Sequence, residues 1–350
     1  MAIREPFPEL EEILASIGEG GQRIATIDAA EGAAGNISVC IGWPIEIRRR
    51  FHVVEEIRLP QRAAHLAGWY VIVSGSGRRL RDIAADPVAN LGVVRIGDDG
   101  ATGTLLTSPR RLFERLTTEW NSHLAVHDDT VARTGTNFHA VVHGQPPHLA
   151  YLSHLPAYRD EEWLSRRLLR WEPETIINLP AGIGVLPFML PGSQALMEAN
   201  VQSLRTHRIV LWSKHGVMSR SDVSVTRAVD RIEYAETAAR YEYMDLVNGE
   251  RAEGLTHDEM RAVVEAFDVK TTIVLAAARA EHPRPPAAQL LGLRDRRGRR
   301  PGCREGGHRG PRCVELPPSR DLPAVCRCRD GGRHRPALRP RVHQRHRLPA

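Results

Sequence analysis

The chain has 350 residues, of which 42% are hydrophobic, enough to bury a substantial globular core. No stretch approaches the ~18 apolar residues of a membrane-spanning helix, and the acidic start lacks the basic and apolar regions of a signal peptide. We therefore expect a cytoplasmic protein. The formal charge of +6 is uneven: residues 283–350 contain 18 arginines against five acidic residues, so the remainder of the chain is net acidic. The overall charge thus gives no reason to expect a nucleic-acid partner.

Helical and extended patterns alternate in the first part of the chain. An apolar repeat of about 3.6 residues predicts a helix over residues 6–18, with Leu10 to Ile17 contributing one apolar face. Residues 108–134 are predicted to form one long helical region, with Ser108 as its cap and Pro109 in its first turn. Apolar runs bounded by turn residues predict strands over residues 35–42, 68–77 and 89–100.

The same alternation continues to residue 269. Strands are predicted over residues 138–144, 174–188 and 208–216, and helices over residues 193–207, 223–249 and 256–269. The last helix starts with a capping box formed by Thr256 and Glu259. Together these elements predict a single α/β domain over residues 1–282, built around a sheet.

Residues 283–350 form a tail of different composition. They contain no Phe, Trp, Tyr, Ile, Met, Asn or Lys, so we expect this basic tail to be disordered. Arginines of such a tail can bind nucleic-acid phosphates. Four of the five cysteines lie here, but their spacings of C-x9-C and C-x-C differ from the C-x2-C of zinc modules. The composition favours a third interpretation, the translation of a shifted reading frame in a GC-rich gene.

Two histidines follow apolar strand patterns in the same way. His143 follows Ala-Val-Val, His215 ends the segment that starts with Ile-Val-Leu-Trp, and each precedes a glycine. The end of a strand is where a sheet delivers side chains to a site, and neutral imidazole is a common metal ligand. One such histidine is more often a hydrogen-bonded structural residue, whereas two in the same context favour a metal site.

Three glycine-containing segments have the composition of a phosphate or dinucleotide site. Residues 31–36 and 73–77 have the composition of a nest of backbone N–H groups that binds phosphate, although a simple turn explains each of them equally well. Residues 18–21 lack the strand–turn–helix context of a dinucleotide site.

Glu119, His123 and His127 recur every four residues and therefore share one face of the predicted helix. A carboxylate near a metal-activated carbon acid is suited to general acid/base catalysis. Spacing alone leaves a solvated or interface face as an equal alternative.

In chain order, several segments resemble the class II aldolase/adducin superfamily. They include EGAAGNISV, LTTEWNSHLAVH and NFHAVVHGQPPHLAYLSHL, and the most specific are LPAGIGVLPFMLPG (residues 179–192) and VLWSKHG (residues 210–216). The resemblance extends from about residue 10 to about residue 275. It implies a three-layer α/β/α fold around a mostly antiparallel sheet, and a homotetramer with active sites near the subunit interfaces.

The resemblance also implies an activity. Members of the superfamily use a divalent metal, usually zinc, and cleave a ketose 1-phosphate reversibly into dihydroxyacetone phosphate and an aldehyde such as lactaldehyde. The metal acts as a Lewis acid for the negative charge that develops beside the carbonyl group. A phosphorylated sugar is therefore the expected substrate, with no membrane or nucleic-acid partner.

Site residues are carried over only at matching positions. His143 and His215 match metal ligands, Glu119 matches the catalytic carboxylate, and Glu174 matches a second acidic residue that comes from a neighbouring subunit. The positions on the phosphate side are Asn36, Ser76, Gly77, Thr117 and Thr118.

The sequence departs from the family pattern at two positions. Gln145 stands where the family has the second histidine of His-x-His, and Ala33 stands where the first phosphate loop carries an asparagine. A glutamine amide oxygen suits zinc less well than imidazole does, so it weakens zinc binding or favours another divalent ion. The sequence is compatible with two alternatives to the aldolase: a non-catalytic, adducin-like binding or structural protein, and a superfamily enzyme with a different substrate.

Overall fold

The computed structural model describes residues 2–271 and residue 273. The predictions for the basic tail, and for a domain boundary at residue 282, lie outside the described residues. Within residues 2–271, no helix is long and apolar enough to cross a membrane.

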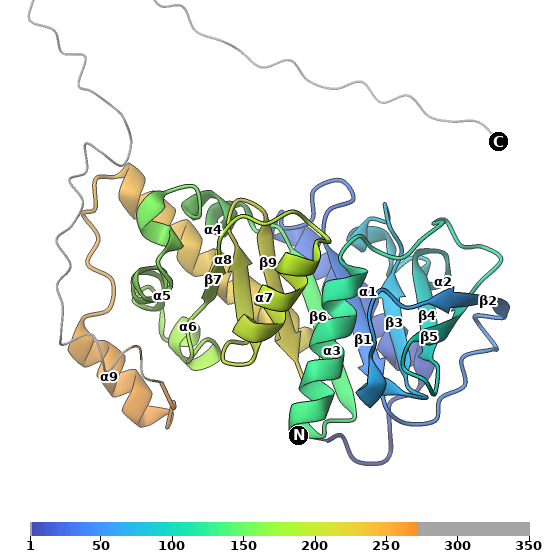
Figure 1. Cartoon of the computed structure of the whole chain (residues 1–350). Coiled ribbons are helices and arrows are strands. Elements are labelled where there is room, and N and C mark those ends of the chain that lie inside the picture. The colour runs from blue at the N-terminus through green and yellow to red at the C-terminus, as the bar shows by residue number, and fades with distance from the viewer. Residues whose placement is uncertain (1, 272, 274–350) are drawn as a thin grey trace, which may run out of the picture. The chain divides into compact units, whose positions relative to one another are not determined.

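A nine-stranded sheet forms the centre of the described chain (Figure 1). Its strand order is β2-β5-β4-β3-β1-β6-β9-β8-β7, and all neighbours are antiparallel except β7 and β8. The strands are β1 (Asn36–Ile41), β2 (Val53–Arg58), β3 (Tyr70–Ser74), β4 (Leu91–Ile96), β5 (Thr102–Thr107), β6 (Phe138–Gly144), β7 (Gly184–Leu186), β8 (Ile209–Trp212) and β9 (Gly216–Ser221).

Helices cover both faces of this sheet. The helices of the described residues are α1 (Leu10–Thr26), α2 (Pro87–Asn90), α3 (Trp120–Thr134), α4 (Pro147–Leu152), α5 (Glu161–Leu169), α6 (Pro173–Asn178), α7 (Gln194–Leu204), α8 (Val225–Val247) and α9 (His257–Ala266). Helices α3 and α7 pack together on the face turned to the viewer in Figure 1, whereas α1 and α8 pack together behind the sheet. The predicted three-layer α/β/α fold with a mostly antiparallel sheet is therefore confirmed.

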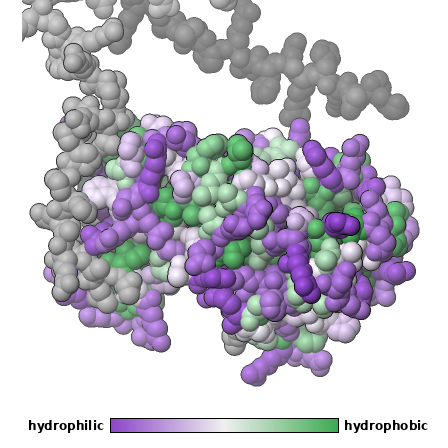
Figure 2. Space-filling view, viewed as in Figure 1, coloured by the Kyte–Doolittle hydropathy of each residue, from purple (hydrophilic) through white to green (hydrophobic). Residues whose placement is uncertain are grey.

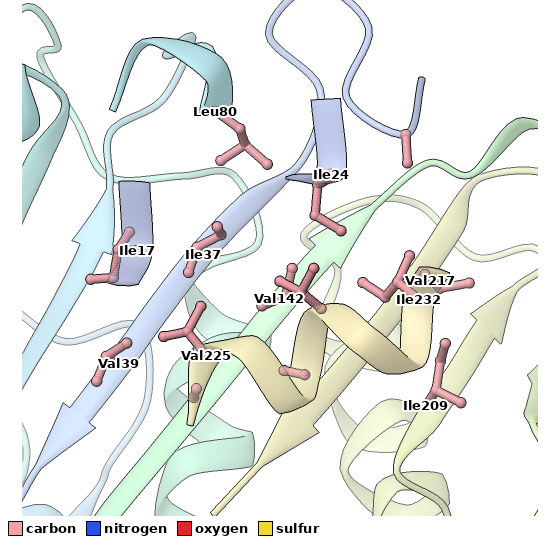
Figure 3. Packing of buried hydrophobic residues seen from close by; sticks show 14 of the residues in the cluster. Ile17, Ile24, Ile37, Val39, Leu80, Val142, Ile209, Val217, Val225 and Ile232 are labelled. Carbon is pink, nitrogen blue, oxygen red and sulfur yellow. The ribbon is translucent and has the colours of Figure 1, made fainter. Parts of the chain in front are cut away.

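Strand β6 shows how the two layers share the sheet. Alternate residues of a strand point to opposite faces. Val142 belongs to the cluster that contains Ile24 of α1 and Ile232 of α8 (Figure 3), whereas Val141 belongs to a second cluster with Val126 of α3. Every residue of β6 is buried, so its polar side chains must find partners inside the protein.

The surface differs from this interior. Hydrophilic side chains cover much of the face seen in Figure 2, with apolar patches between them. Exposed large apolar side chains include Phe188 and Leu190, in the segment that leads into α7.

The first predicted helix is confirmed and is longer than expected. Helix α1 continues through residues 18–21 to Thr26, so these glycines belong to a helix, in agreement with the rejection of a dinucleotide site. A Cβ on Gly21 would lie 2.5 Å from the Leu80 carbonyl oxygen, which shows that the glycine allows this close packing. The capping box of Thr256 and Glu259 is also present, at the start of α9.

The prediction of one helical region over residues 108–134 was wrong in its first half. Helix α3 begins only at Trp120, because the preceding chain bonds to the end of β3 instead. The Ser76 N–H donates to the Arg115 carbonyl at 2.8 Å, and the Thr117 N–H donates to the Ser74 carbonyl at 3.2 Å. Tertiary pairing therefore overrides the local helical pattern.

The prediction of a strand over residues 174–188 was also largely wrong. Pro173 occupies the first turn of α6, and only Gly184–Leu186 pair as a strand. Strands β2, β5 and β9 were not predicted. Strand β2 is mostly exposed, so it lacks the apolar pattern that identifies a buried strand.

Candidate active site

The candidate site lies where β1 begins and β6 ends. Strand β1 runs antiparallel to both β3 and β6, so its first residue, Asn36, is paired with His143 near the end of β6. The end of β6 pairs in turn with the start of β9, which follows the turn that carries His215. The topology thus brings three distant segments of the chain to one edge of the sheet.

Glu119 occupies the N-cap position of α3 and is 7% exposed. Its Oε2 accepts a hydrogen bond from Asn36 Nδ2 at 2.9 Å and a second from the Thr117 hydroxyl at 3.3 Å. The N-terminal end of a helix also favours a negative charge. Glu119 is therefore held as an oriented carboxylate, as an acid/base group requires.

His143 and His215 lie beside each other at this edge. Their ring centroids are 5.0 Å apart, and Trp212 stacks on His143 at 4.7 Å with an interplanar angle of 25°. The Nδ1 of His143 bonds to the Val217 carbonyl at 2.8 Å. A carbonyl only accepts, so this nitrogen carries the proton and Nε2 keeps its lone pair.

Burial sets the charge of both rings. It lowers the pKa of His143 to about 4, against the opposing negative charge of Glu119. Burial also lowers the pKa of His215, again opposed by Glu119 and by Glu31. Both imidazoles are therefore neutral at pH 7, which is the form that binds a metal ion.

The side chain of Gln145 and the ring of His143 lie on the same side of Gly216. A Cβ on Gly216 would lie 3.1 Å from both Gln145 Cγ and His143 Cε1, so both side chains border the space beside Gly216. Gly216 leaves the space in which Gln145 and His143 approach each other. The backbone N–H of Gln145 donates to the Ala29 carbonyl at 2.8 Å, which fixes the chain after β6.

The resemblance to the class II aldolase/adducin superfamily implies a divalent metal, for which these residues are the candidate ligands. Residues 2–271 contain no group of three His, Cys, Asp or Glu side chains arranged to hold a metal ion. The available donors are two neutral imidazoles and one amide oxygen, and the buried Nδ1 of His215 has no protein partner. This set fits a divalent ion, with a weaker preference for zinc than three imidazoles would have.

Two of the five predicted phosphate positions, Asn36 and Thr117, contact the Glu119 carboxylate, and several of the five already use their donors. The Ser76 N–H and the Thr117 hydroxyl are already hydrogen-bonded, and Asn36 bonds directly to Glu119. Gly77 is exposed with a φ of +72°, and nothing lies within 4 Å of where its Cβ would be. Thr118 is also exposed.

Ser76 lines a surface pocket of about 470 Å³ together with Arg111 and Arg115. Arg111 also forms an ion pair with Glu55 at 3.3 Å. Glu114 lines the same pocket, so this side of the loop presents two guanidinium groups and one carboxylate.

Glu174 lies apart from this constellation. It is exposed on α6, which packs against α5, α8 and α9. In Figure 1, α6 is separated from α3 by the strands β7, β8 and β9. A role for Glu174 in the site therefore requires a second subunit.

The largest difference from the sequence expectation concerns His123 and His127. Both are completely buried, so the interpretation of this helix face as solvated is wrong. They face the sheet and bond to Ser38 of β1, at 2.6 Å for His123 and 2.7 Å for His127. Sequence reasoning missed Ser38, although the polar residues at positions 36 and 38 alternate with apolar ones and therefore indicate a polar strand face.

Comparisons with known proteins agree with this geometry. Residues 16–243 match the family of class II aldolase and adducin N-terminal domains. The rhamnulose-1-phosphate aldolase of Bacteroides thetaiotaomicron is 29% identical over 270 residues, which cover 77% of this chain and 98% of that protein. The protein of the same name from Klebsiella pneumoniae subsp. pneumoniae is 31% identical over 216 residues, or 61% of this chain and 76% of that protein.

Among solved structures, the sugar-phosphate aldolase of Thermotoga maritima matches with a TM-score of 0.59 and 26% identity, over 69% of this chain and 98% of that one. The resemblance found in the sequence is thus confirmed. The chain belongs to the class II aldolase and adducin family and is an enzyme of the class II aldolase type.

Proposed function

We propose that this enzyme is a metal-dependent aldolase that cleaves a ketose 1-phosphate, such as L-rhamnulose 1-phosphate, to dihydroxyacetone phosphate and lactaldehyde. The observation that carries the proposal is the convergence of Glu119, His143 and His215 at one edge of the sheet. The two curated relatives named rhamnulose-1-phosphate aldolase support this substrate class.

In this proposal His143, His215 and the amide oxygen of Gln145 hold a divalent metal ion, with zinc the first candidate. When bound, the metal supplies Lewis-acid stabilisation of the negative charge that develops beside the carbonyl group. The hydrogen bond from His143 Nδ1 to Val217 fixes the ring so that Nε2 is the donor atom.

Glu119 moves protons at the reacting carbon or oxygen. Its orientation is set by Asn36 and Thr117, which both donate to the same carboxylate oxygen, Oε2. The other oxygen, Oε1, is therefore the one assigned to the substrate. A carboxylate held in this way exchanges a proton without first having to find its position.

The substrate phosphate is assigned to the side of the site formed by Ser76, Gly77 and Thr118, beside the arginine-lined pocket. The second N–H of the Asn36 amide and Thr117 are assigned to the same side. Binding energy from the phosphate positions the reacting end of the sugar and is independent of the bond that breaks.

A homotetramer in the cytoplasm completes the proposal, with Glu174 supplied to the site by a neighbouring subunit. Its support is the exposure of Glu174 on α6 and of Phe188 and Leu190 beside the site. The segment that contains them approaches α3, because a Cβ on Gly192 would lie 2.8 Å from the Thr118 carbonyl oxygen.

The test is metal analysis and a coupled assay of L-rhamnulose 1-phosphate cleavage by the full chain, before and after chelation. We expect a bound divalent metal, loss of activity with the chelator, and recovery when the metal is restored. The variant His143→Ala should lose both metal and activity, whereas His154→Ala, which changes an exposed histidine on the same segment, should keep both. Cleavage that survives removal of all metal would contradict the proposed mechanism, and a metal-bound protein without cleavage would contradict the proposed substrate.

A further inference from the structure

A continuous line of buried polar side chains connects Glu119 to the interior of the sheet. Asn36 Oδ1 bonds to His123 Nε2, and Ser38 Oγ lies 2.6 Å from His123 Nδ1. The line continues from Ser38 Oγ to His127 Nε2 at 2.7 Å and from His127 Nδ1 to His139 Nδ1 at 2.8 Å. None of these histidines belongs to the metal or phosphate groups assigned above.

The direction of every hydrogen bond in this line is fixed by its first member. An ionised carboxylate only accepts, so Asn36 must turn its Nδ2 toward Glu119 and its Oδ1 toward His123. His123 Nε2 therefore donates. Because the buried ring is neutral, its Nδ1 is an acceptor, and the hydroxyl of Ser38 donates to it.

The same reasoning continues to the end of the line. Ser38 has used its proton, so it accepts from His127 Nε2. His127 Nδ1 then accepts from His139 Nδ1, which leaves His139 Nε2 as a bare lone pair. That nitrogen is buried and has no partner in the described structure. An unpaired acceptor at the end of the line agrees with the derived direction.

Burial supports the neutral state that this derivation requires. Removal from water lowers the pKa of His123, His127 and His139 well below the ordinary value for histidine. The geometry itself does not depend on these shifts, because each neutral ring has one donor and one acceptor at the positions found.

We propose that Ser38, His123, His127 and His139 form a one-way hydrogen-bonded chain that holds the Asn36 amide with its nitrogen toward Glu119, and that they act as positioning residues for this carboxylate. All donors in the chain point toward Glu119, so each bond polarises the next in the same sense. Without His123, the Asn36 Oδ1 loses its donor, and the amide keeps only its bond to Glu119, so its plane and the position of Nδ2 are held less firmly. The catalytic importance of this arrangement rests on the proposed function, whereas the arrangement itself does not.

The first test reads the ring tautomers directly in the full chain. Long-range ¹H–¹⁵N correlation spectra of ¹⁵N-histidine-labelled protein, assigned with single His→Gln variants, distinguish protonated from bare ring nitrogens. We expect the proton on Nε2 of His123 and His127 and on Nδ1 of His139. A proton on Nδ1 of His123 would reverse the chain and overturn the proposal, regardless of any activity.

The second test compares two substitutions of similar polarity. In His123→Gln, the amide nitrogen replaces Nε2 and keeps the donor to Asn36, whereas His123→Asn reaches only the position of Nδ1 and keeps the acceptor for Ser38. We expect His123→Asn to lower kcat about 10- to 100-fold with KM changed less than about threefold, and His123→Gln to stay within about threefold of the native kcat. Metal content and the unfolding midpoint are measured on both variants.

A merely structural role predicts equal effects of the two substitutions, and equal kcat values in two folded, metal-bound variants would overturn the proposal. If His123→Asn does not fold, Ser38→Ala interrupts the chain one bond further from Asn36 and should lower kcat by a smaller factor with unchanged KM. A native kcat for Ser38→Ala would count against the chain. If the native protein cleaves no sugar phosphate, the proposed function fails, and the tautomer spectra still decide the arrangement.

Discussion

Asn36 lies directly opposite His143 in the antiparallel pairing of β1 with β6. This pairing sets the hydrogen-bond partner of Glu119 beside a metal-ligand candidate, and the backbone of two buried strands holds both. Side chains alternate along a strand, so a register shift of one residue would move each of them to the opposite face. The geometry between the acid/base group and the metal ligands is therefore a property of strand register.

Gln145→His should strengthen metal binding, because the change replaces an amide oxygen by an imidazole nitrogen beside His143. We expect zinc affinity to rise at least about tenfold, since zinc prefers nitrogen and sulfur ligands. Competition with a chromophoric chelator measures the dissociation constant, and Gln145→Ala is the control that removes the amide without adding a ligand. Equal affinities of all three proteins would show that the side chain at position 145 does not reach the metal.

Glu119→Gln should abolish most of the activity and leave the metal in place. The amide keeps the shape of the carboxylate but cannot accept and return a proton, so we expect kcat to fall by about 10²- to 10⁴-fold. Activity is measured by the coupled cleavage assay and metal content by elemental analysis. The exposed residue Glu19 of α1 provides a matched control, Glu19→Gln, for which we expect native activity. Near-native kcat for Glu119→Gln would remove Glu119 from the mechanism.

The stability of the protein should fall as pH decreases from about 6.5 toward 4. Burial lowers the pKa of His123, His127 and His139 in the folded state, so these rings stay neutral there while they bind protons in the unfolded chain. The unfolded state then binds more protons, and the free energy of unfolding decreases by up to about 1.4 kcal/mol per pH unit for each such histidine. Above the unfolded-state pKa these histidines are neutral in both states, so they no longer make the free energy of unfolding depend on pH.

Denaturant unfolding at several pH values and one protein concentration measures this dependence. The variant His139→Leu removes one buried ring and should reduce the slope by about one proton. An identical slope in the variant and the native protein would show that His139 is protonated alike in both states.

Gly75→Ala should disrupt the loop that precedes the candidate phosphate side. A Cβ at this position would lie 2.1 Å from Cγ of Phe113, so the ring and the 73–77 loop cannot both keep their places. We expect a loss of about 1–3 kcal/mol in the free energy of unfolding, which is typical of overpacking. The same substitution made in a Phe113→Ala background should recover part of this loss, because alanine lacks Cγ and Cδ1, the two atoms closest to the new Cβ. The absence of any recovery would mean that another contact requires the glycine.

Several elements could be predicted because their signal is local. The helix over residues 6–18 has an apolar repeat, α9 has its capping box, and β6 contains the apolar run Ala-Val-Val that precedes His143. Each pattern reports the burial of its own segment, so no knowledge of neighbours is needed. The loop of residues 108–119 was missed for the opposite reason, since its backbone partners belong to β3.

The candidate site divides in the same way. Glu119, His143 and His215 were recognised by residue type, by position at the ends of predicted elements, and by resemblance to a known family. Their common location depends on the order of β1, β6 and β9 in the sheet, which short patterns do not encode. The proximity of Gln145 to the ring of His143 could not be predicted either, because it depends on the space that Gly216 leaves free.

The sequence by itself determined the family, the fold class and the residue types that carry the chemistry, since these follow from local patterns and motifs along one chain. Only the tertiary structure decided that His123 and His127 are buried and that Asn36 bonds to Glu119. The physical reason is that a helix with a polar stripe is compatible with either water or a polar strand as its partner. The packing of α3 against Ser38 and His139 selects the strand, because each buried ring then has a hydrogen-bond partner in the sheet.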